Sequence, residues 1–119
     1  MLKILVIEDE EIVSNLLQDI LSELGSVEIA LGKDEAISKI VQDRFDLIIA
    51  DYYLKDSNSI EILFEASASV KNVPIILMSG YANDQMKREA SELNIGAFMP
   101  KPLNFDDLFS HINRLTKIN

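Results

Sequence analysis

Residues 3–11 read KILVIEDEE, an apolar run that ends abruptly in four consecutive acids. The apolar part, Lys3 to Ile7, is short and continuous, which indicates a strand that is buried on both faces. Such strands are typical of parallel sheets that helices cover on both sides. The change to acids marks the carboxyl end of this strand, where open parallel sheets carry their functional side chains.

Further apolar segments of the same kind follow along the chain. They are Val27 to Leu31, Asp46 to Ala50, Val73 to Met78 and Ala97 to Met99. The segment that starts at Val27 alternates apolar and polar residues, so we expect it at an edge of the sheet, whereas the continuous ones should lie inside.

Between these segments the apolar residues recur every three or four positions, which predicts helices. The clearest helix runs from Ile12 to Leu24, and Gly25 is expected to end it as a C-cap. The remaining helices are predicted at about residues 34–42, 59–70, 83–93 and 104–115, the last with Asn104 as its N-cap.

Strand and helix alternate five times with short connections, which predicts an α/β fold with right-handed crossovers and helices on both faces of the sheet. We expect a flavodoxin-like (βα)5 arrangement, a doubly wound five-stranded parallel sheet with strand order 2-1-3-4-5, in one domain over residues 1–119. Function should then lie in the crevice beyond the carboxyl ends of the strands.

Composition excludes several classes of function. The 119 residues include 11 Lys+Arg against 20 Asp+Glu, a net charge of −9, which argues against nucleic-acid binding by this domain alone. With no cysteine, the chain has no disulfide framework, thiol nucleophile or cysteine-ligated metal. The N-terminal apolar run is too short for a signal peptide and no run could span a membrane, so we expect a soluble, cytoplasmic protein without a membrane partner.

Reactive side chains follow four of the predicted strands. Glu8 and Asp9 follow the first, Asp51 ends the third, Ser79 ends the fourth, and Lys101 comes after the fifth. Because parallel strands deliver their carboxyl ends to one edge of a sheet, we expect these side chains to converge. Three carboxylates in one cleft repel one another and favour a bound cation. Oxygen ligands without histidine or cysteine select a hard ion, and their small number suits Mg²⁺ better than Ca²⁺.

This set of residues closely resembles the receiver domain of two-component response regulators, including the chemotaxis receivers, and the resemblance covers essentially the whole chain. It implies a Mg²⁺ site formed by Glu8, Asp9, Asp51 and the backbone carbonyl of Tyr53. The second acid of the Glu8-Asp9 pair would be a direct ligand, and the first would often act through water. The resemblance also implies a cis peptide bond between Lys101 and Pro102.

The resemblance further implies a phosphoryl-transfer function. Asp51 would accept a phosphoryl group from a phosphohistidine on a histidine kinase or histidine phosphotransfer protein, or from acetyl phosphate. Lys101 and Ser79 would contact the phosphoryl oxygens, and Ser79 and Phe98 would act as a switch. The switched surface would comprise the fourth helix, fifth strand and fifth helix, and would face a downstream effector or attached output domain. Such a protein is no metabolic enzyme, although it catalyses its own phosphorylation and dephosphorylation.

Some positions depart from the family pattern. Lys55 replaces a common proline, Ser59 a common glycine and Phe98 the commoner tyrosine. These departures leave open a receiver-like interaction module that works without phosphorylation. A third alternative is a hydrolase that forms an aspartyl phosphate, but such enzymes typically carry a second acid two residues after the nucleophile, where this chain has Tyr53.

Overall fold

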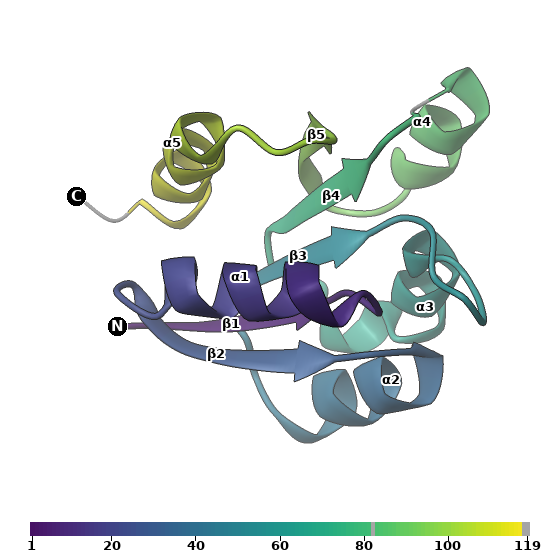
Figure 1. Ribbon diagram of the computed structural model, residues 1–119. Coiled ribbons are helices and arrows are strands. Elements are labelled where there is room, and N and C mark those ends of the chain that lie inside the picture. The colour runs from purple at the N-terminus through teal and green to yellow at the C-terminus, as the bar shows by residue number, and fades with distance from the viewer. Residues whose placement is uncertain (82, 118–119) are drawn as a thin grey trace.

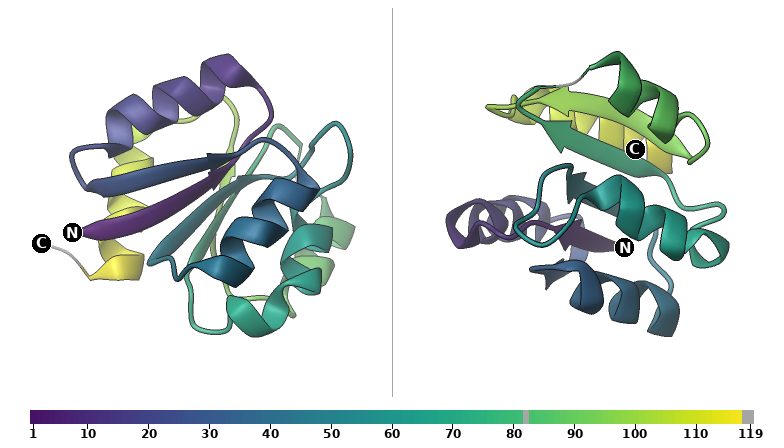
Figure 2. Two further views of the ribbon diagram at one scale, coloured as in Figure 1. Left: turned by 90° about the horizontal axis from the view of Figure 1, so that it is seen from below. Right: turned by 90° about the vertical axis from the view of Figure 1, so that its right-hand side faces the viewer.

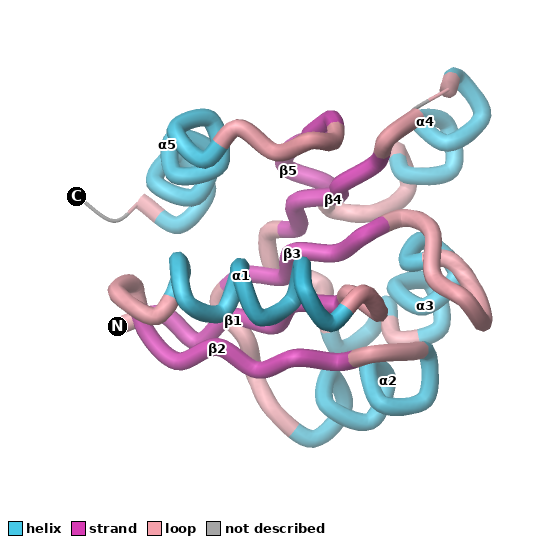
Figure 3. The backbone as a smooth tube through the Cα atoms, viewed as in Figure 1, coloured by secondary structure: helices cyan, strands magenta, loops and turns pink. Residues whose placement is uncertain are grey.

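The computed structural model, described over residues 1–81 and 83–117, contains one parallel sheet (Figures 1 and 3). Its strands are β1 (Leu2–Ile7), β2 (Gly25–Ala30), β3 (Leu47–Asp51), β4 (Ile75–Ser79) and β5 (Ile95–Pro100). They pair in parallel in the order β2-β1-β3-β4-β5. The predicted flavodoxin-like order is confirmed, and the alternating strand β2 lies at an edge.

Helices cover both faces of the sheet (Figure 2). They are α1 (Glu11–Leu21), α2 (Lys33–Gln42), α3 (Ser59–Glu65), α4 (Asp84–Ala90) and α5 (Phe105–Thr116), with a short 3₁₀ helix at Ser67–Ser69. Helices α1 and α5 pack on one face, and α2, α3 and α4 pack on the other. Among the described residues, no helix has the length and apolar character needed to cross a membrane.

The two faces of β3 belong to two separate hydrophobic cores. Ile48 and Ala50 face α2 and α3, whereas Leu47 and Ile49 face α1 and α5. Successive strand residues point to opposite faces, so a strand that is covered on both sides must be apolar throughout. The continuous apolar run in the sequence therefore identified a central strand.

Some helix ends agree with the sequence prediction and others do not. The predicted cap of α5 is confirmed, because the Asn104 side chain accepts a hydrogen bond from the amide of Asp107 at 3.0 Å. The predicted C-cap at Gly25 is wrong. Helix α1 ends at Leu21 with Ser22 as its C-cap, and Gly25 begins β2. Helices α3 and α4 also end earlier than predicted, because the 3₁₀ helix Ser67–Ser69 follows α3 and a turn follows α4.

Gly25 is required for a different reason. It lies opposite Leu2 in the β1-β2 pair with a φ of +158°, and a Cβ atom there would lie 1.8 Å from the carbonyl oxygen of Leu2. We expect Gly25→Ala to lower the free energy of unfolding by about 3 kcal/mol, since the clash involves backbone atoms that cannot move aside. Urea unfolding measures this. Gly80→Ala is the control, because nothing lies within 4 Å of its added carbon. Equal losses in both variants would contradict the argument.

Candidate functional site

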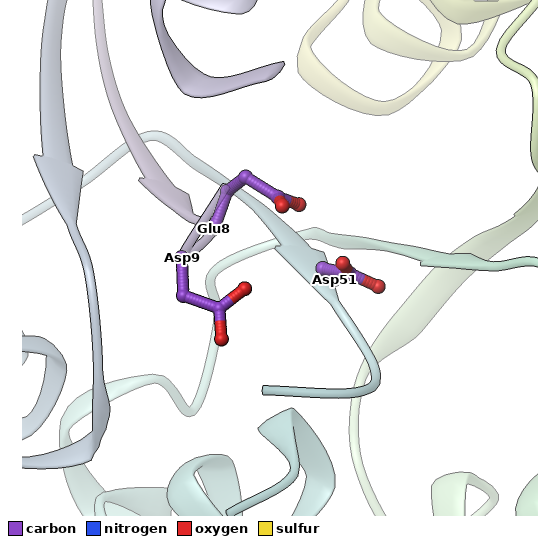
Figure 4. A group of neighbouring side chains, drawn as sticks. All are labelled: Glu8, Asp9 and Asp51. Carbon is purple, nitrogen blue, oxygen red and sulfur yellow. The ribbon is translucent and has the colours of Figure 1, made fainter. Parts of the chain in front are cut away.

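Three carboxylates meet at the carboxyl ends of the neighbouring strands β1 and β3. Glu8 and Asp9 directly follow β1, and Asp51 is the last residue of β3. One carboxylate oxygen from each lies within 4.8 Å of the others. Figure 4 shows the carboxylates of Glu8 and Asp9 turned toward the side on which Asp51 lies. The pairing of β1 with β3, which sets Ile7 opposite Ala50, delivers these acids to one place.

Glu8 is completely buried, which is unusual for an acid. Its Oε1 atom accepts a hydrogen bond from the amide of Glu10 at 3.1 Å, but its Oε2 atom has no hydrogen-bond partner among the described residues. Burial, reinforced by the neighbouring carboxylate of Asp51, raises the pKa of Glu8 to about 8. A buried carboxylate oxygen without a partner, beside two further acids, fits a hard cation.

Lys101 places a positive charge against the acids. Its Nζ atom donates a hydrogen bond to Oδ2 of Asp51 at 2.6 Å and lies 3.8 Å from Oε2 of Glu8. Burial alone would lower the pKa of Lys101, but the hydrogen bond and the attraction to Asp51 raise it. The backbone amide of Lys101 bonds to the carbonyl of Ser79 at 3.2 Å, and the peptide bond to Pro102 is cis, as expected from the resemblance.

Ser79 and Phe98 lie on the neighbouring strands β4 and β5, where Ser79 pairs with Pro100 and Phe98 pairs with Leu77. Ser79 is buried at the end of β4, and its Oγ atom accepts a hydrogen bond from the amide of Tyr81 at 3.1 Å. Phe98 is half-buried and packs against the core below α2, α3 and α4. Both residues line a cavity of about 230 Å³ that also includes Lys87 of α4. Ser79 and Phe98 therefore border the same cavity between β4, β5 and α4.

Tyr53 lies in the loop after β3, two residues beyond Asp51. Its backbone forms an isolated antiparallel bridge with Asn58, which folds the loop back on itself. Its side chain is 55% exposed and its ring meets that of Tyr52 edge to face, with centroids 4.6 Å apart. The ring of Tyr53 therefore lies largely in solvent.

Two further residues, Ser59 and Lys55, contact the acids. The sequence analysis noted them only as departures from the family pattern and did not predict them as site residues. Ser59 is fully buried, and its hydroxyl donates a hydrogen bond to the backbone carbonyl of Asp51. The backbone amide of Lys55 donates to Oδ2 of Asp9 at 2.6 Å. No side-chain pattern reveals a main-chain donor, and the contact of Ser59 depends on the path of the loop.

Sequence comparison connects this geometry with a known family. The family described as "Response regulator receiver domain" matches residues 4–113. The two-component response regulator PhoP of Pseudomonas aeruginosa is 27% identical over 117 residues, which cover 98% of this chain and 52% of that protein. The transcriptional regulatory protein DltR of Streptococcus agalactiae is 25% identical over the same shares. The chain thus spans about half the length of these curated relatives.

Solved structures agree. A CheY-like response regulator receiver domain protein from Methanospirillum hungatei has a TM-score of 0.92 and 27% identity, covering 98% of this chain and 94% of that one. The response regulator protein TrrA of Thermotoga maritima, solved in complex with Mg²⁺ and BeF, has a TM-score of 0.84 and 28% identity, covering 97% of this chain and 99% of that one.

Proposed function

Because the chain belongs to the response regulator receiver domain family, we propose that it accepts a phosphoryl group at Asp51 in a Mg²⁺-dependent reaction. The observation that carries this proposal is the convergence of Glu8, Asp9 and Asp51, with the ammonium of Lys101 2.6 Å from Asp51. The donor in this proposal is a phosphohistidine on a histidine kinase or phosphotransfer protein, or acetyl phosphate. The reaction would take place in the cytoplasm. The phosphorylated domain would then act on a downstream effector or an attached output domain.

The residues present fit a Mg²⁺ ion. Glu8, Asp9 and Asp51, with the backbone carbonyl of Tyr53, would hold it, and the unpartnered oxygen of Glu8 supports that role. When bound, the cation would neutralise charge on the transferring phosphoryl group. The complex of the related TrrA with Mg²⁺ and BeF is consistent with this assignment.

The chemistry of the transfer would be carried by Asp51. Its carboxylate oxygen attacks the phosphorus of the donor, so one O–P bond forms while the P–N bond of a phosphohistidine, or the P–O bond of acetyl phosphate, breaks. Lys101 and Ser79 would donate hydrogen bonds to phosphoryl oxygens. Hydrolysis by water would later restore the carboxylate. In this proposal Ser79 and Phe98 change position with phosphorylation and alter the α4-β5-α5 surface.

Intact-mass spectrometry tests the proposed function directly. With Mg²⁺ and acetyl phosphate, the protein should gain one phosphoryl group, and removal of the metal with EDTA should prevent the gain. No gain under any condition would overturn the proposal in favour of the interaction module. Continuous release of phosphate from phosphomonoesters over many turnovers would instead favour the hydrolase.

Binding of Mg²⁺ should also release a proton. Because the pKa of Glu8 is raised to about 8, the metal-free site is protonated at neutral pH, and a cation ligated there must displace that proton. We expect Mg²⁺ affinity to rise with pH up to about 8, with up to about one proton released at pH 7. Calorimetry in buffers of different ionisation enthalpy measures the release. Affinity without pH dependence and without proton release would contradict this role of Glu8.

A further inference from the structure

Helix α2 is capped by a residue from a distant loop. Its own N-cap, Gly32, has no side chain that could accept a hydrogen bond. The first helical amide, that of Lys33, instead donates to Oδ2 of Asp56 at 3.2 Å. A Cβ atom on Gly32 would approach this Oδ2 to 3.0 Å, so the glycine leaves room for the cap. The Lys33 amide lowers the pKa of Asp56, consistent with a capping carboxylate.

The same loop holds one of the three clustered acids. Lys55, the residue before Asp56, donates its backbone amide to Oδ2 of Asp9 at 2.6 Å. The two contacts share one tight turn, which is closed by a hydrogen bond from the amide of Leu54 to the carbonyl of Ser57 at 3.0 Å. The Ser57 hydroxyl also donates to Oδ1 of Asp56 at 3.1 Å. The turn therefore connects Asp9 to the first residue of α2.

The start of helix α2, which the turn contacts, is itself joined to α3 by ion pairs. The side chain of Lys33 forms ion pairs with Glu65 at 2.8 Å and Glu61 at 3.4 Å, both on α3. Lys33 therefore contacts the loop through its backbone amide, which donates to Asp56, and contacts α3 through its side chain. Helix α3 begins where this loop ends. Loss of the Asp56 contact would free the turn on the side that faces α2.

We propose that Asp56 is a positioning residue: by fixing the turn to α2, it orients the Lys55 amide that holds Asp9, and so couples the metal site to α2. The inference rests on the proposed function, since it concerns Asp9 as a Mg²⁺ ligand. One oxygen of Asp9 engaged by an amide leaves the other for a cation, and partners of this kind orient metal ligands. Because coupling of binding equilibria is reciprocal, Mg²⁺ must also stabilise the first turn of α2.

Asp56→Ala tests the coupling. In this variant Mg²⁺ should bind about 10-fold more weakly, at the low end of the effect of outer-shell partners. Without metal, the amides in the first turn of α2 should exchange faster with deuterium, and Mg²⁺ should no longer slow them. Asp56→Asn should restore both properties, because its amide oxygen can still cap the helix although the charge is gone. Asp34→Ala is the matched control, since it removes an exposed acid from the first turn of α2 itself.

The possible results separate clearly. Faster exchange in α2 with unchanged Mg²⁺ affinity in Asp56→Ala would overturn the coupling and leave only a helix cap. Equal weakening of Mg²⁺ binding in Asp34→Ala, or no rescue by Asp56→Asn, would show a general charge effect and also overturn it. Failure of the wild-type protein to bind Mg²⁺ would overturn the proposed function, and the inference with it.

Discussion

Asp51→Asn is expected to abolish phosphoryl uptake from acetyl phosphate completely. An amide oxygen is a poor nucleophile, and the carboxylate it replaces is the one that meets both the other acids and the Lys101 ammonium. The variant should remain folded, because asparagine has nearly the same shape and its carbonyl oxygen can still accept the hydrogen bond from Lys101. Intact-mass spectrometry measures the uptake, and circular dichroism checks the fold.

Asp19→Asn is the matched control for this substitution. Asp19 is exposed on α1, and its side chain belongs to no part of the acid cluster. It should gain one phosphoryl group, as the wild type does. If Asp51→Asn gained as much as Asp19→Asn, another residue would be the acceptor and the assignment of Asp51 would be wrong.

Glu8→Gln is expected to stabilise the metal-free protein at alkaline pH. The pKa of Glu8 is raised from 4.5 in the unfolded chain to about 8 in the fold, so the folded state keeps a proton that the unfolded state has lost. The free energy of unfolding of the wild type should therefore fall as pH rises from 4.5 to about 8, by at most about 1.4 kcal/mol per pH unit. Glutamine is neutral and similar in shape, so the variant should lack this decline and be more stable by several kcal/mol above pH 8.

Urea unfolding in EDTA across this pH range measures the effect, and Glu11→Gln is the control. Glu11 is an exposed acid in the first turn of α1, and its variant should keep the decline seen in the wild type. Lys101 stays charged throughout the range, since its pKa is raised from 10.5, and adds no slope of its own. Adding Mg²⁺ should reverse the order, because Glu8→Gln loses a metal ligand. Parallel curves for wild type and Glu8→Gln would contradict the burial argument.

The sequence predicted the sheet and the meeting of the acids for simple physical reasons. A strand such as Leu47–Asp51, covered on both faces, must be apolar without alternation, and that pattern is visible in the residues alone. Parallel strands also bring Glu8, Asp9 and Asp51 to one edge wherever the intervening helices lie. The strand order itself followed from the fold-level expectation, because periodicity carries no information on neighbours.

Other features depend on contacts between distant segments and could not be predicted from the sequence alone. Gly25 matched a helix C-cap by its position, but its role comes from the close approach of Leu2 in the adjacent strand. The amide of Lys55 and the cap from Asp56 depend on the path of the loop after β3. The raised pKa of Glu8 depends chiefly on its complete burial, which the exposed neighbours Glu10 and Glu11 do not share.

The location of the acquired phosphoryl group tests the central claim most directly. Wild-type protein treated with acetyl phosphate and Mg²⁺ can be reduced with borohydride, which converts an aspartyl phosphate to homoserine, and then mapped by tandem mass spectrometry of its peptides. We predict conversion at Asp51 and not at Glu8, Asp9 or the exposed acids. Conversion at another carboxylate, or phosphorylated protein with unmodified Asp51, would contradict the account.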